Sequence, residues 1–500
     1  MTRALKRFLV EKLAGSELRA VRARLRRFDE QHQASRGQLE QLAAGLARLE
    51  RQLGAGSADT PGGAPGASGD SGTGAGTVVD ALRRLHAEQR LQSQVHRIDG
   101  LHLQGPARSV LFLHNSYYHF YYLAQALRRR GWRAMSASFE DPNGVNAQYY
   151  HGEDVNLWDP DAQQLRANAL VLFEFAKAHF DLMHFAGDGL LSFFPWNFEQ
   201  DDPADILEWR ALGKSVGYTI SGCNSATSQT SFHAWSATGR GRSACDNCPW
   251  QMRPEVCSDE MNLAWGRRVH AHCDLVFTEL QPSLDLLSAR HANVVRGPCT
   301  MVLDEKLWAD DLEIPQAFRV ERAPGEVLIY HAFGNYAARG MGERNIKGTP
   351  AILAAIERLQ HEGFPVRLMF FSKVPNEIVR YYQAQADIVV DQLWAGSWGA
   401  NGRESLMLGK PVVGFVNRHE NDPADVLPAI AESPILNATE ETIYEVLKAL
   451  VLDPERRRQL SRASREFALP WPSAGAGARR YEEAYDRMLA RRINSERPAR

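Results

Sequence analysis

The stretch "SWGANGRESLMLGKPVVGF" (residues 397–415) combines three kinds of local structure in one short segment. A glycine-punctuated loop, residues 399–402, leads to Glu404. Residues 405–408 are typical of a short helix, and residues 412–415 of a buried strand. The segment therefore predicts a loop, a helix and a strand in the order of a parallel α/β unit, with a carboxylate at the start of the helix.

Strand-like runs alternate with helical patterns on the N-terminal side of this stretch. The runs "EVLIYH", "VRLMFF" and "DIVVD" are separated by expected helices over residues 349–362 and 376–386. An earlier series contains "SVLFLH", "FDLMHF", "KSVGYTI" and "CDLVFTEL". Such alternation predicts parallel sheets with helices on both faces. We expect two doubly wound Rossmann-like α/β domains, residues 107–305 and 325–470, followed by a helix over 473–491, with ligand bound where the strand C-termini face each other.

The first 98 residues have a different organisation. Apolar residues at alternating steps of three and four predict a coiled coil over residues 1–53 that joins copies of the chain; a single amphipathic helix on the catalytic body is the alternative. The same region is basic, which is compatible with contact with an anionic membrane surface or with a solvated helix face. Residues 54–76 form a Gly/Ala/Ser-rich linker, and 77–98 a further helix. We therefore expect a homo-oligomer.

The composition is that of a globular protein. Hydrophobic residues make up 44% and charged residues 24%, and the formal net charge is -2. A chain without an overall basic charge is a poor candidate for binding nucleic acid. No apolar run approaches the length of a membrane span. The expected location is cytoplasmic, with reduced thiols and with peripheral contact at the inner face of the membrane as a further possibility.

The phosphate-binding chemistry falls in the second half. The turn after the first strand, "HNSYYHF" (114–120), contains no glycine, and the chain has no P-loop. In "RNIKGT" (344–349), two cations stand beside a helix start, which suits a diphosphate. Glu404 would repel phosphate, but its carboxylate can accept hydrogen bonds from a ribose diol. These features predict a site for a nucleotide-diphosphate sugar as donor, with binding residues Arg344, Lys347, Gly399, Asn401, Glu404 and Ser405.

The segments "RNIKGT", "YYQAQADIVVDQ" and "ESLMLGKPVV" resemble the C-terminal half of retaining glycosyltransferases of family 4. The resemblance implies the GT-B architecture and transfer of a hexose, with retention, to a hydroxyl of a glycan or lipid-linked acceptor in cell-surface polysaccharide or glycoconjugate synthesis. No catalytic metal is expected, because no Asp-x-Asp stands at a fitting strand end. The resemblance assigns the diphosphate to Arg344 and Lys347 and the ribose to Glu404. The family's first motif glutamate would be residue 396, which is Gly396 here.

The same resemblance suggests catalytic candidates in the first half. The family's D-x-x-H-x-H motif corresponds to "DLMHFA" (181–186), with alanine in place of the second histidine. The resemblance therefore passes the catalytic role to His184 or Asp188; a packed strand histidine is the alternative for His184. Tyr118 and His119 face the same cleft by topology, and aromatic packing is the alternative for them.

Four cysteines cluster in the first half. A C-x2-C pair, a third cysteine nine residues later and a fourth at the end of a strand suit structural zinc. Buried free cysteines are the alternative, and His233, His272 or Cys273 are alternative fourth ligands. The predicted metal ligands are Cys223, Cys245, Cys248 and Cys257.

Two other functions fit the same sequence. One is a nucleotide-sugar epimerase, which needs no second substrate. The other is a catalytically inactive GT-B scaffold, which would bind no donor in calorimetry.

Overall fold

The computed structural model describes residues 73–114, 118–144, 152–186, 191–197, 200–220, 227–237, 241–278, 293–296, 301–334, 336, 344–418 and 428–495. The predicted coiled coil and linker lie outside these residues, so they and the homo-oligomer stay predictions. The described residues from 84 onward, apart from 315–317, belong to one compact unit. None of the described helices is long and apolar enough to cross a membrane.

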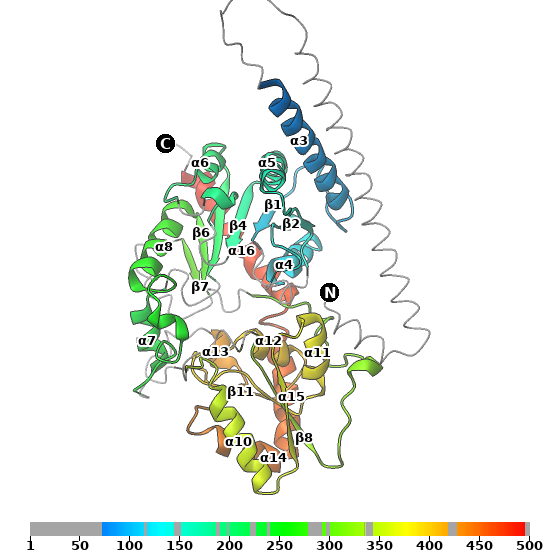
Figure 1. Ribbon diagram of the computed structural model, residues 1–500, viewed down its shortest axis with the longest axis vertical. Coiled ribbons are helices and arrows are strands. Elements are labelled where there is room, and N and C mark those ends of the chain that lie inside the picture. Colours follow the sequence, from blue (N-terminus) through cyan, green and yellow to red (C-terminus); the bar gives the residue numbers. More distant parts are fainter. Residues whose placement is uncertain are drawn as a thin grey trace, which may run out of the picture. The chain divides into compact units, whose positions relative to one another are not determined.

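The first part of this unit contains a parallel sheet with the strand order β3-β2-β1-β4-β5-β6-β7 (Figure 1). Its strands are β1 Ser109–Leu113, β2 Arg133–Ser138, β3 Val155–Asn156, β4 Leu182–Ala186, β5 Ser215–Ile220, β6 Leu275–Thr278 and β7 Val294–Arg296. The associated helices are α3 Thr73–Val95, α4 His119–Arg128, α5 Ala162–His179, α6 Ala204–Ala211, α7 Gln229–Ala237 and α8 Asp259–His272. Two short 3-10 helices are η2 Pro195–Asn197 and η3 Pro249–Met252.

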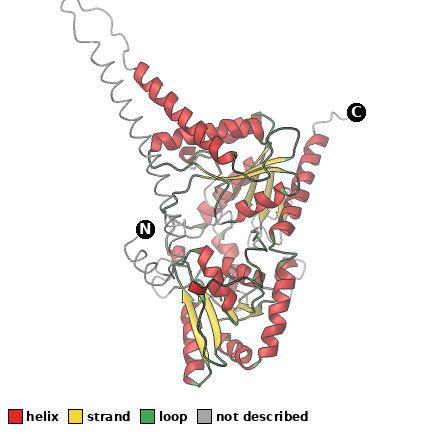
Figure 2. Ribbon diagram, turned by 90° about the vertical axis from the view of Figure 1, so that its right-hand side faces the viewer, coloured by secondary structure: helices red, strands yellow, loops and turns green. Residues whose placement is uncertain are grey.

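A second parallel sheet has the strand order β12-β11-β10-β8-β9. Its strands are β8 Val327–Ala332, β9 Val366–Phe371, β10 Ile388–Val390, β11 Val412–Gly414 and β12 Leu436–Asn437. The helices are α10 Thr349–His361, α11 Asn376–Gln385, α12 Ala400–Met407, α13 Pro428–Glu432, α14 Ile443–Leu452, α15 Pro454–Ala468 and α16 Ala474–Ser495. Helices lie on both sides of the yellow strands in Figure 2. The structure thus confirms two parallel-sheet α/β domains.

Two of the differences from the expectation are informative. Strand β2, "RAMSAS", was not predicted because four of its six residues are alanine or serine, which give no apolar run, yet all six are buried between β1 and β3. The loop expected over residues 399–402 is helical from Ala400 onward, with Gly399 as the N-cap. Glu404 is therefore the fifth residue of α12 and does not start the helix.

The last helix returns to the first domain. Residues just before α16 pair with the segment that leaves the first sheet: Leu303 N–H donates to Pro472 O at 2.8 Å. On α16, Glu482 accepts hydrogen bonds from Arg108 Nη2 at 2.8 Å and from Trp132 Nε1 at 3.0 Å. The rings of Tyr481 and Phe277 stack, with their centroids 4.2 Å apart. Helix α16 is therefore part of the core beneath the first sheet.

We predict that Glu482→Ala loosens α16 from the first domain. The carboxylate is nearly buried and also pairs with Arg130, so its loss should cost roughly 2–4 kcal/mol and lower the melting temperature. Asp486→Ala on the same helix is the matched control, because Asp486 is half-exposed and bonds only to Arg108 among the described residues. Equal melting temperatures for the two variants would contradict this role of Glu482.

Candidate functional site

Lys347 lies at the point where the strand order of the second sheet reverses. Strand β8 has β9 on one side and β10 on the other, so the crevice outside the carboxyl ends of β8 and β10 is the topological switch point. Lys347 Nζ donates to Ala332 O, at the end of β8, at 3.1 Å, and lies 3.5 Å from Oδ1 of Asp391, which directly follows β10. The predicted cation is therefore held at the edge of the sheet where α/β folds bind ligands.

Asp391 organises this edge, and the sequence reasoning missed it. Its side chain is 1% exposed, and Oδ2 accepts a hydrogen bond from Gly399 N–H at 2.6 Å, which caps α12. A Cβ added to Gly402 would lie 2.6 Å from the same oxygen. The glycines thus let a carboxylate approach the helix N-terminus. An aspartate directly after the buried run "IVV" was the signal that could have found it.

Glu404 is enclosed by protein donors. It is 3% exposed; Oε1 accepts from Tyr118 Oη at 2.8 Å and from Asn376 Nδ2 at 3.0 Å, and Oε2 accepts from Gln383 Nε2 at 2.9 Å. Burial raises the pKa of the carboxyl group, and the three hydrogen bonds oppose that rise. A ribose diol at Glu404 therefore has to replace at least one of these donors.

The other α12 candidates lie beside Glu404 inside the protein. Asn401 Oδ1 accepts from Gln383 Nε2 at 2.8 Å, and Asn401 is 8% exposed. Ser405 is fully buried. Neither Asn401 Nδ2 nor Ser405 Oγ has a hydrogen-bond partner within the described part of the chain. A buried polar atom without a hydrogen-bond partner destabilises the folded protein. A polar group that bonded to either of these two atoms would therefore be stabilising.

Arg344 extends toward the first domain. Its Nη1 donates to O of Cys248, the residue before η3, at 3.1 Å and to Oε1 of Gln251 within η3 at 2.9 Å. Lys347 and Arg344 thus come from one short segment but contact different domains. Within the described residues, the Nε and Nη2 donors of Arg344 have no hydrogen bond, so the guanidinium keeps donors for an anion.

His184 is a packed strand histidine in this structure. It is fully buried; Nε2 bonds to Thr219 Oγ1 and Nδ1 to Tyr485 Oη, both at 2.8 Å. Burial lowers the pKa of His184 to about 3, so the ring is neutral. Both ring nitrogens are thus occupied in the core, which is the packed arrangement given above as the alternative. A catalytic role for His184 stays a prediction. Asp188 lies outside the described residues.

The two aromatic candidates after β1 also pack in the interior. His119 Nδ1 accepts from Val302 N–H at 3.0 Å, so in the neutral ring Nε2 carries the proton and donates to Tyr481 Oη at 3.2 Å. Tyr118 packs against Trp308 with the ring centroids 5.1 Å apart. Aromatic packing therefore accounts for both residues, and Tyr118 in addition bonds to Glu404.

The predicted zinc ligands do not form a metal site in the described residues. Cys245, Cys248 and Cys257 are free thiols, and Cys257 Sγ accepts a hydrogen bond from Gln229 Nε2 at 3.3 Å. Burial is the main cause that raises the pKa of Cys245 to about 12. No group of three His, Cys, Asp or Glu residues among those described could hold a metal. Because Cys223 lies outside them, the four-thiolate site stays a prediction without structural support.

Gly396 has a steric reason to be glycine. Its φ is +72°, and an added Cβ would lie 2.6 Å from the ring of Trp235 on α7. Asn417 also links the backbones of the two residues: its Nδ2 donates to Trp235 O, and its N–H donates to Gly396 O. No side chain fits at residue 396, so a carboxylate cannot act from this position.

Comparison with known proteins gave remote similarities only. No family model and no curated protein matches the chain. Among solved structures, sucrose-phosphate synthase from Thermosynechococcus elongatus has a TM-score of 0.46 and 15% identity, covering 77% of this chain and 99% of that chain. Anabaena HepE in complex with UDP-glucose (TM-score 0.43, 11% identity) and UDP-GlcNAc 2-epimerase from Neisseria meningitidis (0.43, 13%) each cover 76% of this chain and 99% of their own. At these values, the similarities carry no conclusion about this chain.

We predict that Gly396→Ala destabilises the protein more than Gly325→Ala does. Both glycines have nearly the same positive φ, +72° and +73°, so both variants pay about 1–2 kcal/mol for the left-handed backbone. Only Gly396 faces a ring; no atom lies within 4 Å of a Cβ at Gly325. The extra cost should be about 1–3 kcal/mol, measured by thermal and urea unfolding. Equal losses in the two variants would disprove the contact with Trp235.

Proposed function

We propose that the chain is a glycosyltransferase that moves a sugar from a nucleotide-diphosphate sugar to a hydroxyl acceptor. The observation that carries the proposal is the place of Lys347 at the switch point of the second sheet, beside the N-termini of α10 and α12. A cation next to two helix N-termini favours an anionic group such as a diphosphate. The resemblance of "RNIKGT" and "ESLMLGKPVV" to family 4 glycosyltransferases supports the same ligand.

Lys347 and Arg344 have donors to spare for the leaving diphosphate. An ammonium has three donors, and Lys347 directs two of them at Ala332 O and Asp391, while its side chain keeps 14% of its surface exposed. As the bond from sugar to diphosphate breaks, negative charge grows on the phosphate oxygens, and fixed positive charges stabilise that charge. Asp391 holds the ammonium in place but also offsets part of its charge.

The finer assignments rest on the family resemblance. They are the GT-B architecture, retention of configuration, a hexose donor and a role in cell-surface polysaccharide or glycoconjugate synthesis. Retention without a protein nucleophile has the acceptor hydroxyl attack from the face that the diphosphate leaves. His184 stays the catalytic candidate of the resemblance, although its ring is buried and neutral here. Glu404 contributes to ribose binding only if the donor displaces Tyr118, Asn376 or Gln383 from its carboxylate.

We predict that Lys347→Ala weakens nucleoside-diphosphate binding by roughly 10- to 100-fold, the value of one or two charge-assisted hydrogen bonds. The measurement is titration calorimetry with UDP, ADP and GDP in turn, followed by a transfer assay with the matching nucleotide sugars. Lys306→Ala, which removes an exposed cation, is the control.

Three outcomes separate the functions. Binding by the wild type that is unaffected in Lys347→Ala refutes the diphosphate site. A donor that binds but is isomerised without acceptor indicates an epimerase. No binding of any nucleotide or nucleotide sugar indicates a scaffold.

A further inference from the structure

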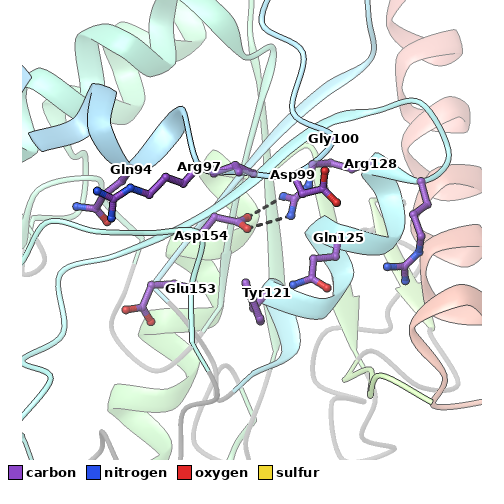
Figure 3. A pocket seen from close by; sticks show the side chains of 11 residues that line it. Gln94, Arg97, Asp99, Gly100, Tyr121, Gln125, Arg128, Glu153 and Asp154 are labelled. Atoms are coloured by element: carbon purple, nitrogen blue, oxygen red, sulfur yellow. Dashed lines mark hydrogen bonds and ion pairs between the residues drawn. The ribbon is translucent and has the colours of Figure 1, made fainter. Parts of the chain in front are cut away.

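A polar pocket lies in the first domain, away from Lys347. It is bounded by the end of α3, by α4 and by the residues just before β3, and its volume is about 420 Å³. Small-molecule sites typically have volumes of roughly 300–1,000 Å³. Figure 3 shows Tyr121 and Gln125 projecting from α4, with Glu153 on the opposite side. Nothing in the proposed donor site uses this pocket.

The floor of the pocket is fixed by internal bonds. Arg128 and Asp154 form a two-bond ion pair, Nη1 to Oδ2 at 2.8 Å and Nη2 to Oδ1 at 3.0 Å, and their side chains are 5% and 4% exposed (Figure 3). Gln94 exchanges two hydrogen bonds with the backbone of Asn156, both at 2.9 Å. These groups satisfy one another, so they give the pocket a rigid shape and no net charge.

The rim supplies balanced donors and acceptors. Arg97 and Arg129 are exposed guanidinium groups, Asp99 is an exposed carboxylate, and Glu153 is a half-buried one whose Oε1 accepts from Asn156 Nδ2 at 2.8 Å. Guanidinium groups only donate hydrogen bonds, ionised carboxylates only accept them, and the Gln125 amide does both. Two positive and two negative charges favour neither an anion nor a cation. A ligand with many hydroxyls, each both donor and acceptor, matches this set.

Tyr121 adds an amphipathic surface to the wall. Its ring is half-buried on the first turn of α4, next to Gly152, where an added Cβ would lie 3.9 Å from Tyr121 Cε1. The face of a tyrosine ring can pack against apolar C–H groups of a ligand, while the tyrosine hydroxyl can hydrogen-bond to a polar group. A sugar ring presents C–H groups on its faces and hydroxyls on its edge, so it can use the ring and the rim together.

From this arrangement, we infer that the pocket binds a neutral oligosaccharide. The site is separate from the donor site. Helix α4 follows β1 directly, so Tyr121 is near the carboxyl edge of the first sheet, and a glycan in the pocket can extend to that edge. In the proposed glycosyltransferase, this glycan is the acceptor, and the pocket binds sugar units remote from the hydroxyl that reacts. This role of the pocket rests on the proposed function.

The test uses the full-length protein and a panel of neutral tetrasaccharides, namely malto-, cello- and chitotetraose and mannotetraose, with tetragalacturonate as an acidic counterpart. Binding is measured by calorimetry and by ligand-observed NMR. We expect at least one neutral member to bind and Tyr121→Ala and Gln125→Ala each to weaken it at least tenfold. Gln92→Ala is the matched control, because Gln92 is an exposed glutamine on α3 that does not line the pocket. Tyr121→Phe, which keeps the ring, should retain most of the affinity and should fold if Tyr121→Ala does not.

Several results overturn the inference. They are no binding of any neutral member, binding of the acidic member only, or binding that Tyr121→Ala and Gln125→Ala leave unchanged. Lys347→Ala separates this inference from the proposed function. Glycan binding that persists in Lys347→Ala while nucleotide binding falls supports both sites. Nucleotide binding without any glycan binding refutes only the pocket.

Discussion

The buried carboxylate of Asp391 is the constraint on which the second domain's ligand edge depends. It sits at the carboxyl end of β10, caps the N-terminus of α12 through Gly399 and lies 3.5 Å from the Lys347 ammonium. A negative charge in such a place is stabilised only because a helix N-terminus and a cation both face it. Its presence requires glycine at residues 399 and 402, because a Cβ would collide with its oxygens or approach them closely. The Asp391 side chain thus fixes where α12 begins, holds the Lys347 ammonium in place and restricts residues 399 and 402 to glycine.

Three residues of the second domain that the sequence analysis singled out contact the first domain. Glu404 receives Tyr118 from the first domain, Arg344 reaches Cys248 and Gln251, and Gly396 fits under Trp235. The residues that the sequence assigns to a nucleotide therefore also hold the domains together. A ligand at this edge competes with protein groups for the same hydrogen bonds, so binding and domain contact are energetically linked.

The predictability of the fold differs from element to element for physical reasons. Apolar runs such as "SVLFL" and "VLIYHA" identify strands, because a parallel strand that is buried on both faces consists almost entirely of apolar residues. Strand β2 has no such run; its burial comes from its neighbours in the sheet. The start of α12 was missed because Asn401 and Gly402 disfavour a helix, and the capping carboxylate comes from a strand end eight residues before Gly399.

For the candidate site, the local sequence pattern predicts the surroundings of Lys347 but not those of Glu404 and His184. Lys347 lies at the edge that its motif predicts, because a cation beside a helix start has a local signature. The surroundings of Glu404 and His184 depend on Tyr118 and Tyr485, which are 286 and 301 residues away along the chain. No local pattern encodes such contacts, so the enclosed surroundings of Glu404 and His184 could not be predicted from the sequence around them.

The return of α16 to the first domain determines the order in which the protein can be completed during synthesis. The core beneath the first sheet includes Tyr481 and Tyr485, so it lacks two large buried side chains until residues near 490 leave the ribosome. The strands of the second sheet, residues 327–437, are all made before that point. The domain that is translated first therefore cannot complete its core before α16 is made, and the nascent chain carries an incomplete apolar core while the whole second sheet is synthesised.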